Sequence, residues 1–303
     1  QNAIQEEGNF TVSLELLDAD GTPTKISTTA ELFSKKGATS GVCGDNARWN
    51  YSEDGTLTIT GSGEMTDFPE SEMSPWYDLR QQITAVSLPS GLASVGDLAF
   101  YGCKELTAVT LPDSVTRVGD YAFAECAELL TVRLGSGVTE IGECAFRACE
   151  KLTAVTLPYS LTTIGSMAFY RCASLAAITV PASVSSMGVS VFAYCTGLVR
   201  ATLSARLAGV PTWTFYGCSA LTEVLLSSTI SASGEYAFKG CDSIDTVYTD
   251  SGDQTVADAL LESIRQGDTS FSADSVTTTP PAGSTTTGGS RGAQTTVSEN
   301  ESS

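Results

Sequence analysis

A phenylalanine recurs every 23 residues along the middle of the chain, and this period constrains the fold more than any other feature. The positions that share it, without an insertion or deletion between them, are Phe100, Phe123, Phe146, Phe169, Phe192, Phe215 and Phe238. A fixed period of about 20–50 residues is typical of solenoids, in which each unit packs on the next. The sequence therefore predicts a stack of equal coils.

Two further columns of residues keep the same period. A cysteine lies three residues after each phenylalanine, at Cys103, Cys126, Cys149, Cys172, Cys195, Cys218 and Cys241. A leucine or isoleucine follows three residues later, from Leu106 to Ile244. One period before Phe100, Tyr77 takes the place of the phenylalanine in a unit without the cysteine. We therefore expect eight units between residues 77 and 250, the last one truncated.

A single unit contains the pieces of one coil. The segment around Phe123 and Cys126 predicts a short helical turn, and the alternating apolar residues of Leu129–Leu134 predict a strand with one buried face. Val138–Ile141 forms a second extended piece, and Gly142 follows it at a corner where we expect a backbone free of Cβ restrictions. One such unit buries too little apolar surface to fold alone, so the units must stack and both ends need caps.

The later units depart from this pattern. Ser204 and Ser227 replace the proline that follows the strand in earlier units, Pro211 replaces the corner glycine, and Ser233 replaces an isoleucine. We therefore expect the C-terminal third of the coil to be the looser part.

The repeat A-F-x-x-C-x-x-L-x-x-V-x-L-P-x-S-V-x-x-I-G resembles the BspA-like class of leucine-rich repeats over about residues 73–250, as LTAVTLPYSLTTIGSMAF at residues 152–169 illustrates. The preceding GVCGDNARWNYSEDGTLTITGSGEMTDF is similar to the N-terminal cap of such repeats in surface proteins of gut-type Gram-positive bacteria. The resemblance implies an α/β solenoid: a right-handed leucine-rich-repeat coil of short strands and short helical turns with a β-hairpin N-terminal cap. It also implies a secreted or cell-surface protein with a role in adhesion.

The N-terminal part of the chain precedes the repeat. Alternating residues around Asp20-Gly21 predict a β-hairpin in the segment of residues 1–41, which would belong to an upstream module. Asp18 and Asp20 match a calcium loop poorly because its other ligands are absent, so we expect no metal there. Residues 42–76 are predicted to form the N-terminal cap, with a hairpin around Asp54-Gly55.

Two segments follow the predicted solenoid of residues 77–250. Residues 251–271 carry Val256, Ala259, Leu260 and Ile264 at helical spacing, as a C-terminal cap helix should. Residues 272–303 consist mainly of Ser, Thr, Gly and Pro and cannot bury enough apolar surface to become ordered, so they predict a disordered tail.

The charge balance excludes several partners. The chain has 35 acidic and 16 basic residues, a formal net charge of -19, which repels nucleic acid and anionic membrane surfaces. No apolar run approaches the ~20 residues that a membrane span needs, so we predict no membrane insertion. We expect a monomer.

Catalytic chemistry has few candidate residues. The chain contains no histidine, which removes Ser-His-Asp and Cys-His systems and the commonest ligand of catalytic zinc. Acids such as Glu105, Glu128 and Glu150 lie in different units without a shared pocket. We predict that the protein is not an enzyme and has no cofactor or metal, although a pocket joining two carboxylates would favour a hydrolase.

The cysteine column favours packing over chemistry. Stacked cysteines would lie ~4.8 Å apart with parallel side chains, whereas a disulfide needs Cβ atoms ~3.5–4.5 Å apart and zinc needs converging ligands. We therefore expect buried, free thiols. Cys43 and Cys144 lie outside the column, and a bond between them would require distant segments to meet.

The outward face of the first strand is the leading candidate for binding. Alternation points two columns of side chains outward. One column is Ala85, Ala108, Thr131, Ala154, Ala177, Arg200, Glu223 and Thr246, and the other is Ser87, Thr110, Arg133, Thr156, Thr179, Thr202, Leu225 and Tyr248. Arg133, Arg200, Glu223, Leu225 and Tyr248 are the predicted ligand-binding residues. Alternatively, small residues merely suit a tight concave ladder.

Aromatic residues next to the repeat phenylalanines are a second candidate. Tyr101, Tyr170 and Tyr216 follow a phenylalanine, and Tyr121, Trp213 and Tyr236 precede one by two residues. Exposed rings at these positions could stack on sugars or peptides, but partial burial along the edge of the coil is favoured.

These observations favour a non-enzymatic extracellular module that recognises a protein or glycan of host matrix or microbial surface through the solenoid. The alternative is a passive spacer or display scaffold within a larger surface protein. A hydrolase is the third hypothesis.

Overall fold

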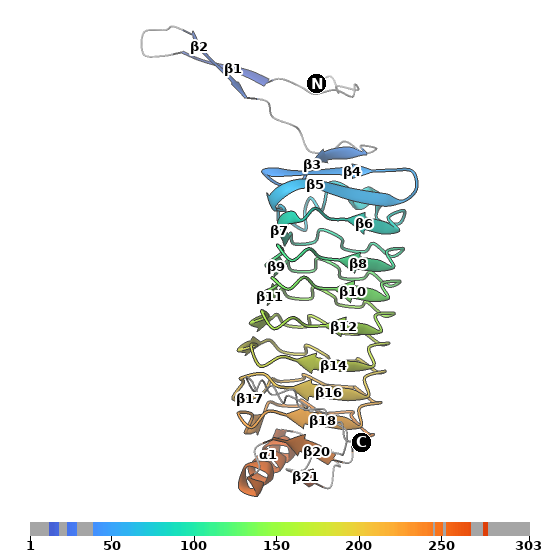
Figure 1. Ribbon diagram of the computed structural model, residues 1–303, viewed down its shortest axis with the longest axis vertical. Coiled ribbons are helices and arrows are strands. Elements are labelled where there is room, and N and C mark those ends of the chain that lie inside the picture. Colours follow the sequence, from blue (N-terminus) through green and yellow to red (C-terminus); the bar gives the residue numbers. More distant parts are fainter. Residues whose placement is uncertain are drawn as a thin grey trace, which may run out of the picture.

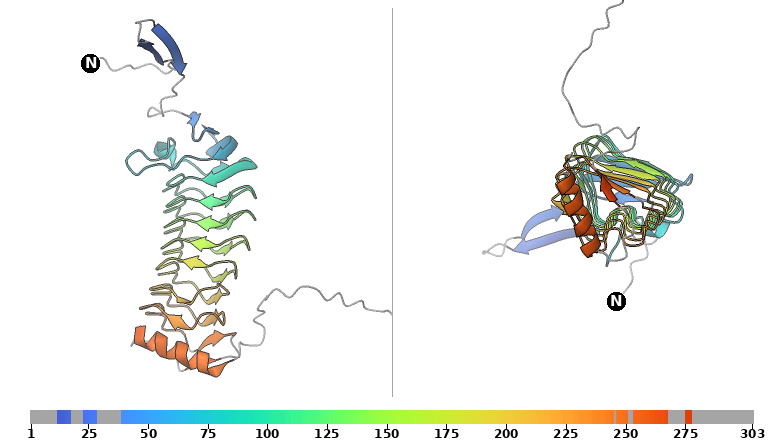
Figure 2. Two further views of the ribbon diagram at one scale, coloured as in Figure 1. Left: turned by 90° about the vertical axis from the view of Figure 1, so that its left-hand side faces the viewer. Right: turned by 90° about the horizontal axis from the view of Figure 1, so that it is seen from below.

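The chain forms a β-solenoid of stacked coils (Figure 1). The computed structural model describes residues 12–17, 23–28, 39–244, 246–250, 253–267 and 275–277. Viewed along the stack, successive coils superimpose (Figure 2). This agrees with the predicted repeat, since equal units with one period place equivalent residues above one another.

One side of the solenoid is a ladder of parallel strands, one from each coil (Figure 1). The strands are β6 (Ala85–Ser87), β8 (Ala108–Thr110), β10 (Thr131–Arg133), β12 (Ala154–Thr156), β14 (Ala177–Val180), β16 (Arg200–Leu203), β18 (Glu223–Leu226) and β20 (Thr246–Thr249). Their register follows the period of the sequence, because Thr131 pairs with Ala108 on one side and Ala154 on the other. The central residue of each short strand, such as Val132, points into the core.

A second ladder of strands closes the opposite part of each coil. It contains β7 (Gly91–Val95), β9 (Arg117–Val118), β11 (Glu140–Ile141), β13 (Thr163–Ile164), β15 (Ser186–Met187), β17 (Gly209–Val210) and β19 (Ala232–Ser233). Strand pairing runs unbroken from β7 to β15 and separately joins β17 to β19.

Pro211 explains the break between β15 and β17. In other coils the corner glycine donates its N–H to the preceding coil, as from Gly188 to Ile164 O at 2.9 Å and from Gly234 to Val210 O at 2.7 Å. Proline has no N–H to donate. The predicted irregularity of the later units therefore takes the form of one interrupted ladder.

The segment around each repeat phenylalanine is a turn and not the predicted helical turn. We call the five residues centred on each of these phenylalanines the phenylalanine turn. The N–H groups of Leu98, Phe100 and Gly102 donate to Asp120 O, Ala122 O and Ala124 O of the next coil at 2.8, 2.7 and 2.8 Å. A helix would use these donors within its own segment. The only helix among the repeat units of the described residues is the single 3-10 turn Tyr77–Leu79.

Left-handed residues at both ends of the phenylalanine turn prevent a helix. The residue two before each phenylalanine has φ between 52° and 57°, and the residue two after it has φ between 58° and 76°. A right-handed helix cannot contain such residues. Most of them are not glycine, for example Tyr121, Glu125 and Ala148, so the sequence carries little sign of this conformation.

The corner glycines serve a different purpose from the expected one. Gly119, Gly142 and Gly165 do not have positive φ. A Cβ on Gly142 would instead lie 2.4 Å from Asp120 Oδ1 and 2.7 Å from the carbonyl carbon of Gly119. Close approach of the preceding coil, and not backbone conformation, therefore requires glycine here.

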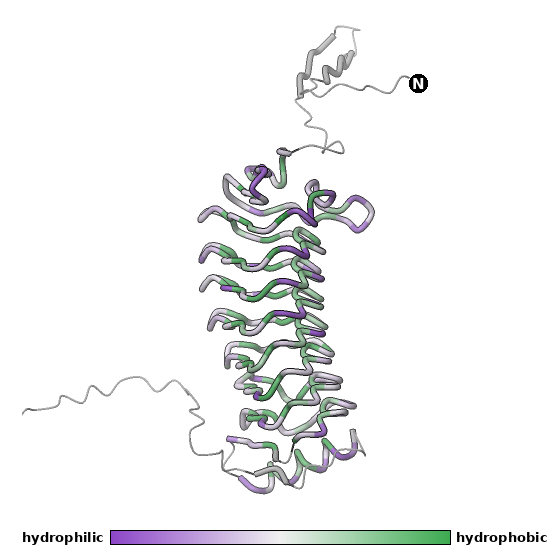
Figure 3. The backbone as a smooth tube through the Cα atoms, turned by 90° about the vertical axis from the view of Figure 1, so that its right-hand side faces the viewer, coloured by the Kyte–Doolittle hydropathy of each residue, from purple (hydrophilic) through white to green (hydrophobic). Residues whose placement is uncertain are grey.

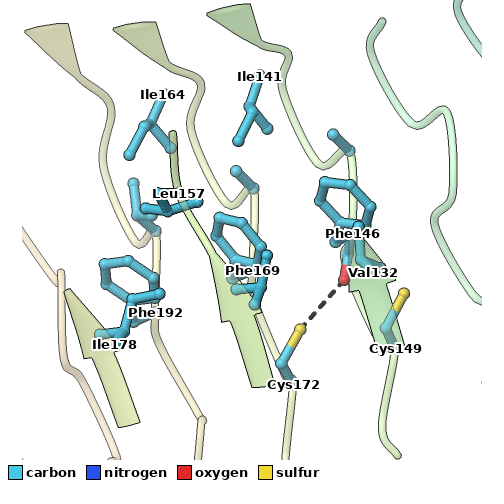
Figure 4. Packing of buried hydrophobic residues seen from close by; sticks show 14 of the residues in the cluster. Val132, Ile141, Phe146, Cys149, Leu157, Ile164, Phe169, Cys172, Ile178 and Phe192 are labelled. Atoms are coloured by element: carbon cyan, nitrogen blue, oxygen red, sulfur yellow. Dashed lines mark hydrogen bonds between the residues drawn. The ribbon is translucent and has the colours of Figure 1, made fainter. Parts of the chain in front are cut away.

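The core is a continuous column of stacked aromatic rings (Figure 4). Ring centroids of successive phenylalanines from Phe100 to Phe238 lie 5.0–5.8 Å apart, with interplanar angles of 24° or less. Apolar segments recur at the same place in each coil (Figure 3). This column provides apolar burial that no coil could achieve alone.

Trp76 begins the aromatic column, which corrects the assignment of Tyr77 to this place. The Trp76 ring stacks on Phe100 at 5.8 Å, and its Nε1–H donates to Ala99 O at 2.7 Å. Tyr77 is half-buried and stacks on Tyr101 outside the column. The indole N–H thus supplies a donor to the first turn, where no earlier phenylalanine turn precedes it.

A β-meander lies on the N-terminal coil. Strands β3 (Ser40–Val42), β4 (Asn46–Tyr51) and β5 (Thr56–Glu64) are antiparallel, and β5 also pairs in parallel with both β6 and β7. Trp49 is buried against Trp76 at 5.6 Å. The strands expected on both sides of Asp54-Gly55 are therefore present.

The predicted N-terminal hairpin is also present. Strands β1 (Val12–Leu17) and β2 (Pro23–Thr28) pair in antiparallel register. Asp18, Asp20 and Gly21, which were considered as a calcium loop, lie outside the described residues.

The C-terminal end carries the predicted helix, α1 (Gln254–Gly267). Its buried residues are Ala257, Leu260 and Ile264, whereas the expected Ala259 is exposed and Val256 is half-buried. Gly267 O accepts the N–H of Tyr236 at 3.0 Å, so the helix takes the place of a next coil.

A short strand follows the helix. Strand β21 (Ser275–Thr277) pairs in parallel with β20, so the prediction that disorder begins at Ser272 is wrong for these three residues, whose backbone groups extend the ladder. The other residues of the expected tail, 272–274 and 278–303, lie outside the described residues.

The left-handed positions predict opposite effects of two matched substitutions. Ala148 has φ 58° and Ala154 lies in an extended strand. Ala148→Gly should raise the free energy of unfolding by about 0.5–1 kcal/mol, because relief of left-handed strain exceeds the entropic disadvantage of glycine. Ala154→Gly should lower it by about 0.5–1 kcal/mol. Urea titration measures both, and destabilisation by both variants would contradict the assigned turn.

Candidate functional site

The outward side of the first ladder is a surface of small neutral residues with two arginines. We call the outward residues of strands β8 to β16 the strand face. Its members are Ala108, Thr110, Thr131, Arg133, Ala154, Thr156, Ala177, Thr179, Arg200 and Thr202. All are exposed except Thr202, which is half-buried. The pleat therefore orients these two columns as predicted, and none of the ten side chains is acidic.

Acidic residues are also scarce in the middle coils as a whole. Between residues 152 and 234 the charged residues are Arg171, Arg200, Arg206 and Glu223, which gives this stretch a net charge of +2. The whole chain has a net charge of -19. The acidic charge therefore lies toward the two ends of the chain, and the middle coils present a locally positive surface.

The predicted charged residues of the ladder differ in their exposure and in their ion pairing. Arg133 is exposed on β10. Arg200 pairs with Glu223 of the next strand through Nε and Oε2 at 3.0 Å, and its side chain is 60% exposed against 17% for Glu223. An ion pair this exposed contributes little to stability. Arg200 can therefore exchange Glu223 for an acidic group of a ligand.

Leu225 does not belong to the exposed surface, contrary to the prediction. Its exposure is only 6%. Leu225 lies in register between Thr202 and Tyr248 of the neighbouring strands, so the side chains on both sides cover it. Tyr248 is half-buried. The predicted residues thus reduce to Arg133 and Arg200 with Glu223 and Tyr248 at the C-terminal end of the ladder.

Three exposed apolar residues beside the strand face were not predicted. Leu130 and Val199 directly precede β10 and β16 and are 44% and 45% exposed, and Tyr159 follows β12 and is 81% exposed. The repeat contained a signal, because the equivalent residues in neighbouring coils include Thr107, Thr153 and Thr222. Packing does not require a large apolar side chain at this position, because threonine occupies it in other coils.

The aromatic residues of the phenylalanine turns are mostly half-buried, as was favoured. This holds for Tyr101, Tyr121, Tyr170, Tyr216 and Tyr236, whereas Trp213 is 42% exposed. Tyr194 is 38% exposed and was missed, because it follows Phe192 by two residues while Tyr170 and Tyr216 follow their phenylalanines by one. The predicted column of tyrosines therefore does not contain it.

The cysteine column is buried and its sulfur atoms form hydrogen bonds. From Cys126 to Cys241, each Sγ–H donates to the carbonyl of the phenylalanine 26 residues earlier, as from Cys172 to Phe146 O at 3.2 Å (Figure 4). All nine cysteines are unpaired and buried, including Cys43 and Cys144. Each thiol of the column thus fills space and joins two coils.

Burial keeps these thiols protonated. Desolvation, with a smaller contribution from the thiol of the preceding coil, raises the pKa of Cys126, Cys149 and Cys172 well above the ordinary value. Desolvation raises the pKa of Cys43 and Cys103 to about 12. Because the thiolate is the nucleophile and the metal ligand, these cysteines are chemically inert in the folded protein.

A polar recess at the N-terminal end brings three carboxylates together. It has a volume of about 400 Å³ and is lined in part by Asp45, Glu64 and Asp67. Partial burial alone would raise the pKa of Asp67, but the hydrogen bond from the Asp97 amide and the pairing with Arg117 at 2.9 Å lower it. A general acid of a hydrolase needs a raised pKa. Asp67 therefore acts as an ion-pair partner.

Two kinds of feature are absent from the described residues. No group of three or more histidine, cysteine or acidic side chains there could hold a metal ion. No helix in the described part of the chain has the length and apolarity needed to cross a membrane.

Comparisons with known proteins agree with the repeat architecture. A family model described as BspA type leucine rich repeat region matches in six copies over residues 76–199 and 162–277. No curated protein matches the sequence.

Solved structures of bacterial leucine-rich repeat proteins are similar to this chain. The T. pallidum leucine rich repeat protein TpLRR is 28% identical with a TM-score of 0.50, and the match covers 65% of this chain and 86% of that one. A leucine-rich repeat protein from Bacteroides ovatus is 26% identical with a TM-score of 0.52, covering 68% and 54%. The pneumococcal vaccine antigen PcpA is 20% identical with a TM-score of 0.53, covering 75% and 58%, and shares the fold.

The buried thiols predict that alkaline pH destabilises the protein. Cysteines of the unfolded chain ionise near pH ~8.5, whereas the buried thiols stay protonated. As pH rises above ~8.5, the unfolded state loses protons that the folded state keeps, so stability falls by up to about 1.4 kcal/mol per pH unit for each thiol.

Replacing two members of the column tests this. Urea titrations from pH 7 to 10 in the presence of a reductant should show a steeper loss of stability for the unmodified chain than for Cys149→Ser/Cys172→Ser. Tyrosine and lysine titrations cancel in the comparison. Equal pH slopes would show that these thiols ionise in the folded state.

Proposed function

Because the chain belongs to the BspA type leucine rich repeat family, we propose that it is a non-enzymatic extracellular recognition module. It binds a protein or glycan of host matrix or a microbial surface through the strand face. The observation that carries this proposal is the absence of acidic side chains from the strand face of a chain with net charge -19.

Solubility alone does not explain this distribution. A protein kept soluble by acidic charge gains from acids on every exposed surface. Outward residues of a strand are less restricted by packing than core residues, yet ten successive outward positions contain only Ala, Thr and two Arg. A surface without like charge lets an anionic or neutral partner approach.

The strand face also has the physical features of a contact surface. Small side chains allow a partner to approach the backbone ladder closely, while Leu130 and Val199 supply exposed apolar area beside it. Arg133 and Arg200 provide long, polar side chains of the kind that dominates binding energy in interfaces. Hydrogen bonds between successive coils hold these groups at fixed spacing, which reduces the entropy lost on binding.

A passive spacer is the alternative function. A stack of identical coils is a stiff rod whose length grows with the number of units. A spacer needs no ligand, so it predicts that exposed substitutions on the strand face change no interaction.

Charge reversal of the two arginines tests the proposal. The chain is first applied to an array of extracellular-matrix proteins and glycans, and the strongest saturable ligand is then titrated by biolayer interferometry. Arg133→Glu/Arg200→Glu should weaken binding at least tenfold, because it places two acids on the face. The matched control Arg206→Glu/Lys104→Glu changes the net charge equally at exposed residues outside the strand face and should retain affinity within about twofold.

Two results would contradict the proposal. Absence of any saturable ligand on the array would favour the spacer. Equal loss of affinity in both double variants would show that net charge, and not the strand face, governs binding.

A further inference from the structure

Three tyrosines and an arginine form a cluster on the phenylalanine turns of neighbouring coils. We call Tyr170, Arg171, Tyr194 and Tyr216 the tyrosine edge. The ring centroid of Tyr194 lies 5.5 Å from that of Tyr170 and 5.3 Å from that of Tyr216, with interplanar angles of 75° and 67°. The guanidinium carbon of Arg171 lies 5.5 and 5.7 Å from the centroids of Tyr170 and Tyr194. The cluster lies outside both strand ladders.

The backbone under this cluster is rigid. Ala148 N–H donates to Tyr170 O at 2.7 Å, Arg171 N–H to Ala193 O at 2.9 Å and Tyr194 N–H to Tyr216 O at 2.7 Å. These bonds join one coil to the next, so the side chains of the cluster are spaced by the coil repeat. A ligand would meet groups that are already positioned, which lowers the entropic penalty of binding.

The backbone conformation at two of these residues is energetically unfavourable for any residue with a side chain. Arg171 and Tyr194 have φ of 59° and 60°, and the equivalent residues of other coils include Gly102, Gly217 and Gly240. A side chain in the left-handed conformation costs about 1–2 kcal/mol relative to the right-handed one. Glycine would remove this strain, so two large exposed side chains here point to a use on the surface.

The charge of the tyrosine edge is positive. Arg147 lies one coil before Tyr170 at the equivalent position, and Lys239 lies one coil after Tyr216. Lys239 Nζ stands 4.6 Å from the ring centroid of Tyr236, so an aromatic residue accompanies this cation too. Glu125 pairs with Arg147 at 3.4 Å, and the next coils contribute no acid at these positions.

We propose that the tyrosine edge binds a linear polysaccharide that carries carboxylate or sulfate groups. The C–H faces of sugar rings pack on aromatic side chains, and the exposed guanidinium of Arg171 pairs with an anionic substituent. Arg147 and Lys239 extend the positive edge in both directions along the stack. A polymer lying parallel to the solenoid axis would contact one coil after another.

The spacing of the charges favours a polysaccharide over nucleic acid. Arg147 and Arg171 lie in successive coils, whereas two coils that contribute only tyrosine or small residues separate Arg171 from Lys239. An acidic polysaccharide has uncharged sugar surface between its anionic groups, and this surface can pack on the tyrosines between Arg171 and Lys239. Nucleic acid has a phosphate at every nucleotide, which is a denser anionic charge than the few cations of this edge can neutralise.

Fluorescence anisotropy with end-labelled oligosaccharides tests the proposal on the full chain. The probes are an oligogalacturonate for carboxylates, a chondroitin sulfate oligosaccharide for sulfates, and a neutral maltodextrin of the same length. One or both acidic probes should bind saturably, with an affinity that falls as salt is raised. The maltodextrin should bind at least tenfold more weakly, because it lacks the anionic groups.

Substitutions to glycine separate binding from folding. Arg171→Gly and Tyr194→Gly reproduce residues that other coils already have, so both should fold with unchanged or higher melting temperature. Each should weaken the acidic probe about tenfold, the effect of losing one aromatic or charge contact. Tyr159→Ala and Arg206→Ala are the matched controls, since they remove an exposed tyrosine and arginine elsewhere, and they should retain affinity within about twofold.

Several results would overturn the proposal. These are no saturable binding of either acidic probe, equal binding of the maltodextrin, equal losses in the control variants, and tighter binding of an oligothymidylate than of the acidic sugars. Arg133→Glu/Arg200→Glu should leave probe affinity within about twofold. A large loss in that variant would assign the probe to the strand face and remove it from the tyrosine edge.

Discussion

Hydrogen bonds between successive coils are the interaction on which the rest of the structure depends. From Phe100 to Phe215, each phenylalanine turn donates three N–H groups to the next coil, as Leu98, Phe100 and Gly102 do, and the two strand ladders add further bonds. Because donors and acceptors are in adjacent coils, no coil satisfies its own backbone. The strict period of 23 residues is the consequence, since any insertion would shift a donor away from its acceptor.

The structures at the two ends of the solenoid follow from the same need for backbone partners in a neighbouring coil. At the N-terminal end, Trp76 replaces a missing backbone donor with its indole N–H, and β5 supplies a partner strand to both ladders. At the other end, Gly267 at the end of α1 accepts the N–H of Tyr236. Where Pro211 removes a donor inside the stack, the second ladder is interrupted between β15 and β17, but the phenylalanine turns still join these coils, as from Phe192 N–H to Thr214 O at 2.9 Å.

Much of this fold could be predicted from the sequence, because buried positions repeat. Phe146, Cys149 and Val155 are buried at equivalent places in their coils, as the columns predict. The conformation of the phenylalanine turn could not be predicted, because left-handed residues such as Tyr121 and Glu125 are not glycine. Their conformation is imposed by bonds to neighbouring coils, which a reading of one unit does not contain.

The candidate surfaces were predictable to a smaller extent. Alternation correctly placed Arg133 and Arg200 outward, but it could not reveal that Leu225 is covered by its neighbours in register. The predicted column of tyrosines does not contain Tyr194, because this residue is displaced by one position in the repeat. Its ring nevertheless contacts Tyr170 and Tyr216. Exposed residues vary between coils because packing does not restrict them, so the repeat pattern predicts the core better than the surface.

Amide hydrogen exchange followed by NMR tests the central claim that the phenylalanine turns are held by neighbouring coils. The N–H groups of Phe123, Phe146 and Phe169 donate to Ala145 O, Ala168 O and Val191 O of the following coils. If coils must separate before these amides can exchange, they should belong to the slowest class in the protein, with rates similar to those of the strand amides. Exchange of these amides as fast as that of exposed residues such as Tyr159 would contradict the account.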